Sequence, residues 1–301
     1  MKLPLVSSDD LKNVIPALTT IDAPTAGGQK LVFRCTMGEM CFALKVMLAG
    51  DAVVGGETEE DGEDILDEVT ARAKREVAII SACETPHVVK AGPIPLTAAE
   101  INGQKTIYFS EEWIEGRDLS RILQDGSLSI ADVVELGRAM TLAIQALWEV
   151  KKIHRDIKPG NIMRRDGAGH FVLLDMGIAF DPLDVSLTAA GVVIGTMIYV
   201  SPEQVEYAKK RQMDFRSDCF SLGMVMYEAV TGRHPFWVPG MLSQQAVGNI
   251  LMSNPERPRT YRPEMPAELE RIILRLLGKQ PHLRYRTCED LLAALGEVPL
   301  T

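Results

Sequence analysis

The sequence predicts an α+β fold in which a strand-rich first part is followed by a helical second part. The runs KLVFRC and MCFALKVM flank the glycine-containing turn TMGE, a pattern that is typical of a β-hairpin. After the segment IEGRDL, the apolar residues recur at helical spacing instead. This change of character near Ile114–Leu119 predicts a boundary between two lobes.

The rest of the first part is expected to add two strands and one helix. The segments VVKAGPIPL and KTIYFSEEWI are interpreted as strands, and the glycine-rich acidic segment AGDAVVGGETEEDGEDI as a solvated loop. A helix is expected from Ile65 to Ser81. One face of it carries, at helical spacing, Ile65, Val69, Ala73, Glu76 and Ile80. The carboxylate of Glu76 interrupts this otherwise apolar stripe, and the helical pattern alone does not explain a charged group at this position.

Three segments of the second part carry helix boundary signals. SLSIADVVELGRAMTLAIQALWEVKK begins with Ser129 and Asp132 at the spacing of a capping box, with Asp in place of Glu. TCEDLLAALG repeats this pattern with Thr287 and Asp290. SDCFSLGMVMYEAVTG is apolar nearly all round and ends at Gly232, which predicts a buried central helix.

Composition narrows the class of protein. The chain has 301 residues, of which 46% are hydrophobic and 24% charged, as expected for a globular protein with a real core. Its net charge of −9 argues against nucleic-acid binding through phosphates. No apolar run is long enough to span a bilayer, and the N-terminal segment lacks the pattern of a signal peptide. The five cysteines form no CxxC pair, which favours reduced thiols and a cytoplasmic location.

A crowded polar segment, HRDIKPGN, occupies residues 154–161. Asp156 could accept the proton of an incoming hydroxyl group, and Lys158 could neutralise a phosphoryl group in transfer. Asp175 follows the strand-like run HFVLLD. Its carboxylate and the amide of Asn161 are oxygen donors of the kind that Mg²⁺ prefers. Together these residues suit phosphoryl transfer, in which catalysis is chiefly positioning and charge stabilisation.

Five motifs together resemble one family. HRDIKPGN, DMG, GTMIYVSPEQ, SDCFSLG and HLRYRT, in this order, are similar to the eukaryotic-type (Hanks-type) serine/threonine protein kinases of bacteria, over roughly residues 14 to 298. The resemblance implies one kinase domain with a bilobal α+β fold. Residues 1–112 would form a small, mainly antiparallel β lobe with one regulatory helix, 113–118 the hinge, and 119–301 a larger helical lobe.

The resemblance implies an active site that uses ATP with Mg²⁺, or with Mn²⁺ in its place. Asp156 would be the catalytic base and Lys158 would contact the transferred phosphate, with Asn161 and Asp175 as metal ligands. Lys45 would hold the α- and β-phosphates, and Glu76 would pair with it. Taken alone, Lys45 and Glu76 would be better interpreted as a surface lysine and an incidental helix carboxylate.

Further positions follow from the same resemblance. The nucleotide pocket would be lined by Gly27, Gly28, Val32, Ala43, Lys45, Glu112, Ile114, Asp118 and Met163. Glu111 would guard the back of this pocket, where an apolar residue is commoner. Structural roles would fall to His154, Met176, Glu203, Asp218 and Arg284, with Glu203 and Arg284 forming an ion pair. A phosphate on Thr188 would pair with Arg155 and regulate the enzyme.

The chain departs from the family pattern in two places. In TAGGQKLV, Thr25 and Lys30 replace the first and third glycines of the phosphate-covering loop, and Lys30 could either crowd this loop or add a cation near the phosphates. Met176 replaces the usual phenylalanine, and methionine can fill the same apolar position. Neither change removes a catalytic group.

Three functions are compared on these observations. The leading hypothesis is a kinase that phosphorylates serine and threonine in proteins, including its own activation loop, which is compatible with a transient homodimer. The altered glycine loop leaves open a pseudokinase or scaffold. A small-molecule kinase is disfavoured because GTMIYVSPEQ resembles a peptide-docking segment.

Overall fold

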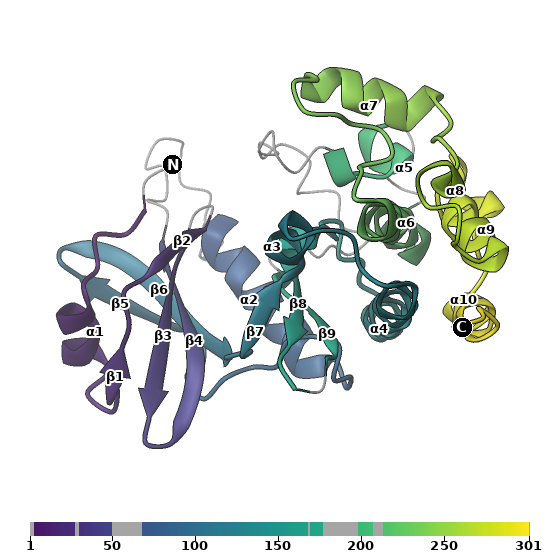
Figure 1. Cartoon of the computed structure of the whole chain (residues 1–301). Helices are drawn as coiled ribbons and strands as arrows, with labels where there is room; N and C mark the ends of the chain where they lie inside the picture. Colours follow the sequence, from purple (N-terminus) through teal and green to yellow (C-terminus); the bar gives the residue numbers. More distant parts are fainter. Residues whose placement is uncertain are drawn as a thin grey trace, which may run out of the picture. The chain divides into compact units, whose positions relative to one another are not determined.

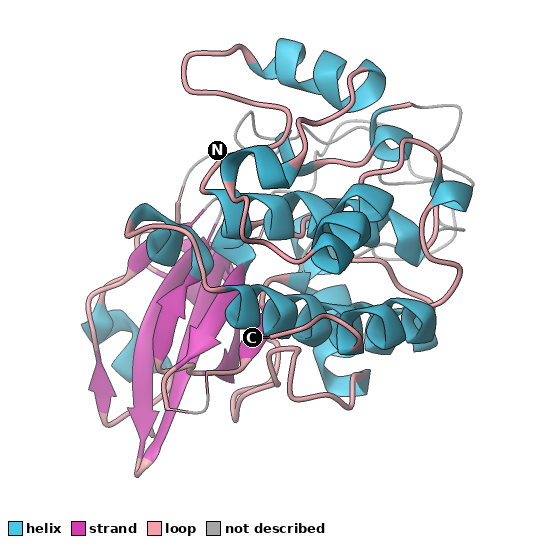
Figure 2. Ribbon diagram, turned by 45° about the vertical axis from the view of Figure 1, so that its right-hand side comes forward, coloured by secondary structure: helices cyan, strands magenta, loops and turns pink. Residues whose placement is uncertain are grey.

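The computed structural model describes residues 3–27, 30–49, 68–167, 169–176, 198–206 and 213–300. The chain divides into two compact units. The first comprises Met1–Ala82 and Val89–Ile114, and the second comprises Cys83–Val88 and Glu115–Thr301. Figures 1 and 2 show that the first unit is dominated by a sheet and the second by helices. The strand-rich and helical character of the two parts follows the sequence prediction.

An antiparallel six-stranded sheet organises the first unit. Its order is β1-β3-β4-β6-β5, with β2 paired to β3. The strands are β1 (Thr20–Ile21), β2 (Thr25–Gly27), β3 (Lys30–Met37), β4 (Met40–Leu48), β5 (Thr97–Ile101) and β6 (Gln104–Glu112). The predicted hairpin is the β3–β4 pair, in which Met37 lies opposite Met40.

Strand β4 is buried on both of its faces. Phe42, Leu44 and Val46 point into a core that also contains Leu11 of helix α1 (Ser8–Val14). Met47 points to the opposite face and packs near Ala73 of helix α2 (Glu68–Ala82). Because side chains alternate along a strand, Ala43 and Lys45 share the face of Met47, which is the face that α2 covers.

The prediction of a strand at VVKAGPIPL is wrong. Val88 and Ala91 form only isolated bridges, and the strand at this edge of the sheet is β5, which begins at Thr97. Pro93 and Pro95 have no N–H group to donate to a neighbouring strand, so a regular ladder cannot continue through them.

The second unit combines a small sheet with a helical core. Its sheet has the order β7-β8-β9, formed by β7 (Gly116–Asp118), β8 (Ile162–Arg165) and β9 (Phe171–Leu173). The helices are α3 (Leu119–Gln124), α4 (Ile130–Glu149), α5 (Pro202–Val205), α6 (Phe215–Thr231), α7 (Ser243–Met252), α8 (Pro258–Tyr261), α9 (Ala267–Leu276) and α10 (Cys288–Gly296). Within the described part of this unit, 3₁₀ turns include η1 (Pro159–Asn161) and η5 (Pro281–Leu283).

The predicted starts of α4 and α10 and the predicted end of α6 are confirmed. The Ser129 hydroxyl accepts a hydrogen bond from the Asp132 N–H at 3.0 Å at the start of α4. The Thr287 hydroxyl accepts one from the Asp290 N–H at 3.1 Å at the start of α10. Helix α6 ends at Gly232 with φ of 69°, a left-handed conformation that glycine adopts without strain. Helix α6 is buried along most of its length and packs against α4 and α9.

One glycine is required by close backbone approach. Gly116 in β7 has φ of 154°, and a Cβ atom there would lie 2.0 Å from the carbonyl oxygen of Arg164 in β8. Only glycine permits β7 and β8 to pair at this point. In the part of the chain that the structure describes, no helix has both the length and the apolar character needed to cross a bilayer.

Candidate active site

The backbone of the predicted catalytic loop is hydrogen-bonded to α6, the central helix of the second unit. Asp218 of α6 accepts hydrogen bonds from the N–H of His154 at 2.7 Å and of Arg155 at 2.8 Å. Arg155 has φ of 68°, which is strained for a residue with a side chain. The two hydrogen bonds hold the loop in this conformation. Burial raises the pKa of Asp218, and the charge of His154 and the two N–H groups oppose that rise.

The carboxylate of Asp156 is held by one of its two oxygens. Its Oδ2 accepts from Lys158 Nζ at 2.8 Å and from Asn161 Nδ2 at 2.9 Å. Its Oδ1 is buried and has no hydrogen-bond partner among the described residues. Burial raises the pKa of Asp156, while Lys158 lowers it. The carboxylate therefore has a fixed orientation, and one of its oxygens can still accept a hydrogen bond.

Asn161 and the segment before Asp175 are hydrogen-bonded to each other. The N–H of Leu174 donates to the carbonyl oxygen of Asn161 at 2.8 Å, and Asp175 follows with φ of 65°. Among the described residues, no group of three or more His, Cys, Asp or Glu side chains is arranged to hold a metal. A pair of oxygen donors from Asn161 and Asp175 still fits Mg²⁺, because that ion is commonly held by one or two protein carboxylates together with substrate phosphates.

Another buried carboxylate of this unit, that of Glu203, forms an ion pair through both of its oxygens. The guanidinium of Arg284 donates to Glu203 Oε1 at 2.6 Å and to Oε2 at 2.9 Å, and the Ser217 hydroxyl also donates to Oε1 at 2.8 Å. Burial would raise the pKa of Glu203, but the hydrogen bonds and charge of Arg284 outweigh it and lower that pKa. The structure thus contains the ion pair that the resemblance implies.

The first unit holds a different cluster, in which one cation contacts two carboxylates. Lys45 Nζ lies 2.7 Å from Glu76 Oε1 and 2.6 Å from Glu111 Oε1. All three residues are buried, with exposed fractions of 5%, 3% and 3%. Ala43 lies opposite Glu111 and Lys45 opposite Phe109, so Lys45 and Glu111 are diagonal neighbours on one face of the sheet. The contact of Lys45 with Glu76 agrees with the resemblance, whereas that with Glu111 was not predicted.

Comparisons with known proteins identify the family of the chain. Residues 32–294 match the family model described as the protein kinase domain. The chain belongs to this family. Its relatives include serine/threonine-protein kinase PknE of Mycobacterium bovis, which is 32% identical over 277 residues covering 89% of this chain and 44% of the relative. PknE of Mycobacterium tuberculosis (strain H37Ra) is 34% identical over 230 residues, or 74% of this chain and 37% of the relative.

A third relative is PknH of Mycobacterium bovis, 30% identical over 271 residues that cover 89% of this chain and 43% of the relative. The chain thus spans less than half the length of these curated relatives. The prediction of a serine/threonine protein kinase domain of the bacterial type, with an α+β fold, is confirmed.

The other residues that the kinase resemblance singles out lie on both units. Val32 lies on β3, Ala43 on β4 and Gly27 at the end of β2. The N–H of Glu112, at the end of β6, donates to the carbonyl oxygen of Lys90 at 2.9 Å, and Ile114 is buried. Gly28 and Thr188 lie outside the described residues.

Two of these kinase positions face each other across a strand pair. Asp118 of β7 and Met163 of β8 are register partners. The carboxylate of Asp118 also caps α3, because its Oδ1 accepts from the N–H of Arg121 at 3.0 Å. His154 and Met176 are fully buried, as their predicted structural roles require.

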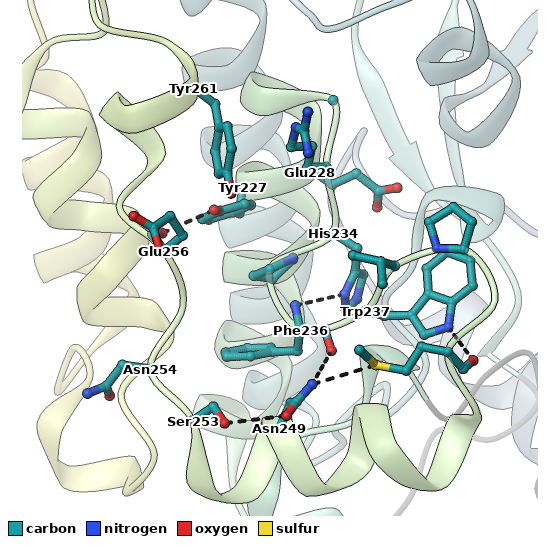
Figure 3. A pocket seen from close by; sticks show the side chains of 16 residues that line it. Tyr227, Glu228, His234, Phe236, Trp237, Asn249, Ser253, Asn254, Glu256 and Tyr261 are labelled. Atoms are coloured by element: carbon teal, nitrogen blue, oxygen red, sulfur yellow. Dashed lines mark hydrogen bonds between the residues drawn. The ribbon is translucent and has the colours of Figure 1, made fainter.

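A separate pocket of the kinase domain lies at the end of α6 and beside α7, and none of the predicted site residues lines it (Figure 3). Its volume is about 430 Å³. The indole N–H of Trp237 donates to the carbonyl oxygen of Met241, and Asn249 donates to that of Phe236, each at 3.1 Å. These bonds fix the loop between the two helices, and no sequence motif indicated the pocket.

Proposed function

We propose that the chain is the catalytic domain of a protein kinase that transfers the γ-phosphoryl group of ATP to serine and threonine hydroxyl groups of proteins. The observation that carries this proposal is the state of the Asp156 carboxylate. One oxygen is held by Lys158 and Asn161, and the other is a buried acceptor without a partner among the described residues. A hydroxyl group that approaches this oxygen would find a base already oriented toward it.

The neighbours of Asp156 have distinct tasks in this proposal. Lys158 stays within hydrogen-bond distance of Oδ2, so its charge is available to a phosphoryl group that approaches Asp156. Asp218 keeps the loop in a strained conformation, which prevents loss of the geometry between turnovers. Asp156 Oδ1 would accept the proton of the hydroxyl group as its oxygen bonds to the γ-phosphorus, while the bond from that phosphorus to the bridging oxygen breaks and ADP leaves.

A divalent metal and ATP are implied by the family. We infer that the metal is Mg²⁺, held by Asn161 and Asp175, with Mn²⁺ as a substitute. When bound, the ion neutralises charge on the phosphates. The chain itself contributes Lys45, oriented by Glu76, as the cation for the α- and β-phosphates. The adenosine would contact Val32, Ala43, Glu112, Ile114, Asp118 and Met163, with Gly27 and Gly28 near the phosphates.

We also propose that the substrates are proteins and include the chain's own activation segment. Thr188 is the expected site, and its phosphate would pair with Arg155. A transient homodimer would form during this autophosphorylation. We also propose that the chain acts in the cytoplasm and does not bind nucleic acid. Mass spectrometry after incubation with Mg-ATP tests this part, because a segment 175–203 without phosphate would contradict it.

Phosphate transfer from radiolabelled ATP to a generic basic protein tests the main proposal. We expect Asp156→Asn to lower the rate by roughly 10²- to 10⁴-fold, the usual contribution of a general base. The matched control is Asp166→Asn, which removes an exposed carboxylate after β8 and should leave the rate unchanged. Equal background rates for the native chain and Asp156→Asn, with both folded by circular dichroism, would favour the scaffold instead.

A further inference from the structure

The cluster of Lys45, Glu76 and Glu111 carries more negative than positive charge. One ammonium group lies within hydrogen-bond distance of two carboxylates, and all three side chains are buried. With every group ionised, the cluster would carry a net charge of −1 away from water. Two carboxylates that share one site cannot both ionise easily, so one of them favours its protonated form.

Glu111 is the carboxylate that favours the proton. Burial is the main cause, and the charge of Glu76 adds to it, whereas Lys45 and Lys30 act in the opposite direction. The pKa of Glu111 is raised to about 7 as a result. Among the residues that the structure describes, these charged groups lie on β4, α2 and β3.

The position of Glu111 is set by the sheet. Glu111 and Lys45 lie on neighbouring strands of a continuous antiparallel ladder, in which Ala43 faces Glu111 and Lys45 faces Phe109. Sheet register does not shift by less than a residue, and a shift would turn the side chains to the other face. The backbone positions of Glu111 and Lys45 therefore stay adjacent, and Glu111 remains a close partner available to Lys45.

We propose that Glu111 is a positioning residue that competes with nucleotide phosphates for Lys45, so that binding of the nucleotide is coupled to uptake of one proton by the Glu111 carboxylate. This inference rests on the proposed function, in which Lys45 binds the phosphates. The proton comes from solvent and forms an O–H bond on Glu111. The neutral carboxyl group no longer holds Lys45 by charge, and the pair of Lys45 and Glu76 remains balanced beside the anionic phosphates.

The coupling predicts how affinity depends on pH. If only the protonated form of Glu111 permits phosphate binding, the apparent dissociation constant equals the intrinsic constant divided by the fraction protonated. With a pKa of about 7, that fraction is ~0.9 at pH 6 and ~0.1 at pH 8. Binding of Mg-ADP to the native chain should then weaken about 10-fold between these two pH values.

Isothermal titration calorimetry with Mg-ADP tests the inference on the native chain and on Glu111→Gln, in two buffers of different ionisation heat. The native chain should take up close to one proton at pH 8 and almost none at pH 6. Glu111→Gln should take up none beyond the nucleotide's own contribution and bind about 10-fold more tightly than the native chain at pH 8, with equal affinity at pH 6. Glu100→Gln, which removes an exposed carboxylate from β5 of the same sheet, should match the native chain.

Each other outcome overturns the inference. Mg-ADP binding with equal proton uptake in the native chain and Glu111→Gln would overturn it and leave the proposed function intact. Weaker binding by Glu111→Gln at pH 8 would do the same, because Glu111 would then help rather than compete. Absence of nucleotide binding at both pH values would overturn the inference and the proposed function together. If Glu111→Gln does not fold, carbon-13 NMR titration of the Glu111 carboxyl group in the native chain decides the matter: its pKa should rise when Mg-ADP is bound, and an unchanged pKa overturns the inference.

Discussion

The two units bury charge in opposite ways. In the second unit, the guanidinium of Arg284 meets both oxygens of Glu203, and the Ser217 hydroxyl adds a third donor. In the first unit, Lys45 is shared between Glu76 and Glu111. The first arrangement pairs one cation with one carboxylate and is geometrically complete, whereas the second places two carboxylates against one ammonium group. A neutral pair suits a fixed scaffold, and an unbalanced cluster suits a site that exchanges partners.

The pair of Glu203 and Arg284 offers the largest test of this comparison. Glu203→Ala would leave Arg284 buried without its carboxylate, and removing one partner of a buried pair typically costs about 3–5 kcal/mol. We expect the free energy of unfolding of the second unit to fall by this order. Hydrogen exchange of amides in α6 measures it without mixing in the unfolding of the first unit.

The control for Glu203→Ala is an exposed ion pair. Arg34 and Asp22 lie 3.4 Å apart, with 40% and 53% of their side chains exposed. Asp22→Asn should change stability by about 1 kcal/mol or less, as surface pairs usually do. Comparable losses of unfolding free energy from both substitutions would show that the buried pair of Glu203 and Arg284 contributes no more stability than an exposed pair.

Asp218→Asn is expected to have the next largest effect. Both oxygens of Asp218 accept backbone N–H groups of the catalytic loop, and an asparagine would present one NH₂ group to one of those donors. The loss should be about 2 kcal/mol in unfolding free energy, since a buried donor is left unsatisfied. Catalysis should fall as well, because Arg155 would relax from its positive φ.

The control for Asp218→Asn is Asp214→Asn on the same helix. Asp214 caps α6 by accepting from the N–H of Arg216 at 2.9 Å, and asparagine caps helices about as well as aspartate. Phosphate transfer and thermal unfolding compare the two variants. If both variants lose activity equally, the helix end rather than the loop contacts is responsible.

Local sequence patterns account for most of the fold. The caps at Ser129 and Thr287 and the end of α6 at Gly232 depend on a few consecutive residues, so spacing alone predicts them. The strand prediction at VVKAGPIPL failed because the segment is apolar but contains two prolines, which lack the N–H groups that a strand needs. Strand β5 has the sequence TAAEI, in which apolar and polar residues do not alternate, so nothing in that pattern indicated the edge of the sheet.

In the candidate site too, some contacts follow from the sequence and others do not. The contact between Lys45 and Glu76 follows from the family resemblance, and so does the ion pair of Glu203 and Arg284. The contact between Lys45 and Glu111 depends on the register of β4 against β6, which joins residues 66 positions apart. Sequence could indicate a polar group at Glu111, but it could not specify which cation that group reaches.

The unbalanced cluster also makes a prediction about stability. The pKa of Glu111 is about 7 in the folded chain against an ordinary 4.5, so the folded state binds more protons between these values. The free energy of unfolding should therefore fall as pH rises from 4.5 to 7, by up to about 3 kcal/mol for this group. Glu111→Gln should remove this fall, which amide exchange in β4 and β6 would show. A first unit that becomes more stable toward pH 8 would contradict the assignment.

The smallest expected effect concerns Lys30, which replaces a glycine of the phosphate-covering loop and whose charge lowers the pKa of Glu111. Lys30→Gln should raise that pKa by a few tenths of a unit, as expected for a cation acting at a distance through partly screened surroundings. Carbon-13 NMR titration of the Glu111 carboxyl group measures the shift, and Lys105→Gln, an exposed cation at the other end of β6, serves as control. An unchanged pKa of Glu111 in Lys30→Gln would leave steric crowding of the loop as the remaining effect of Lys30. An upward shift would link the altered loop and Glu111 electrostatically, because the added cation of the loop would then partly offset the extra carboxylate.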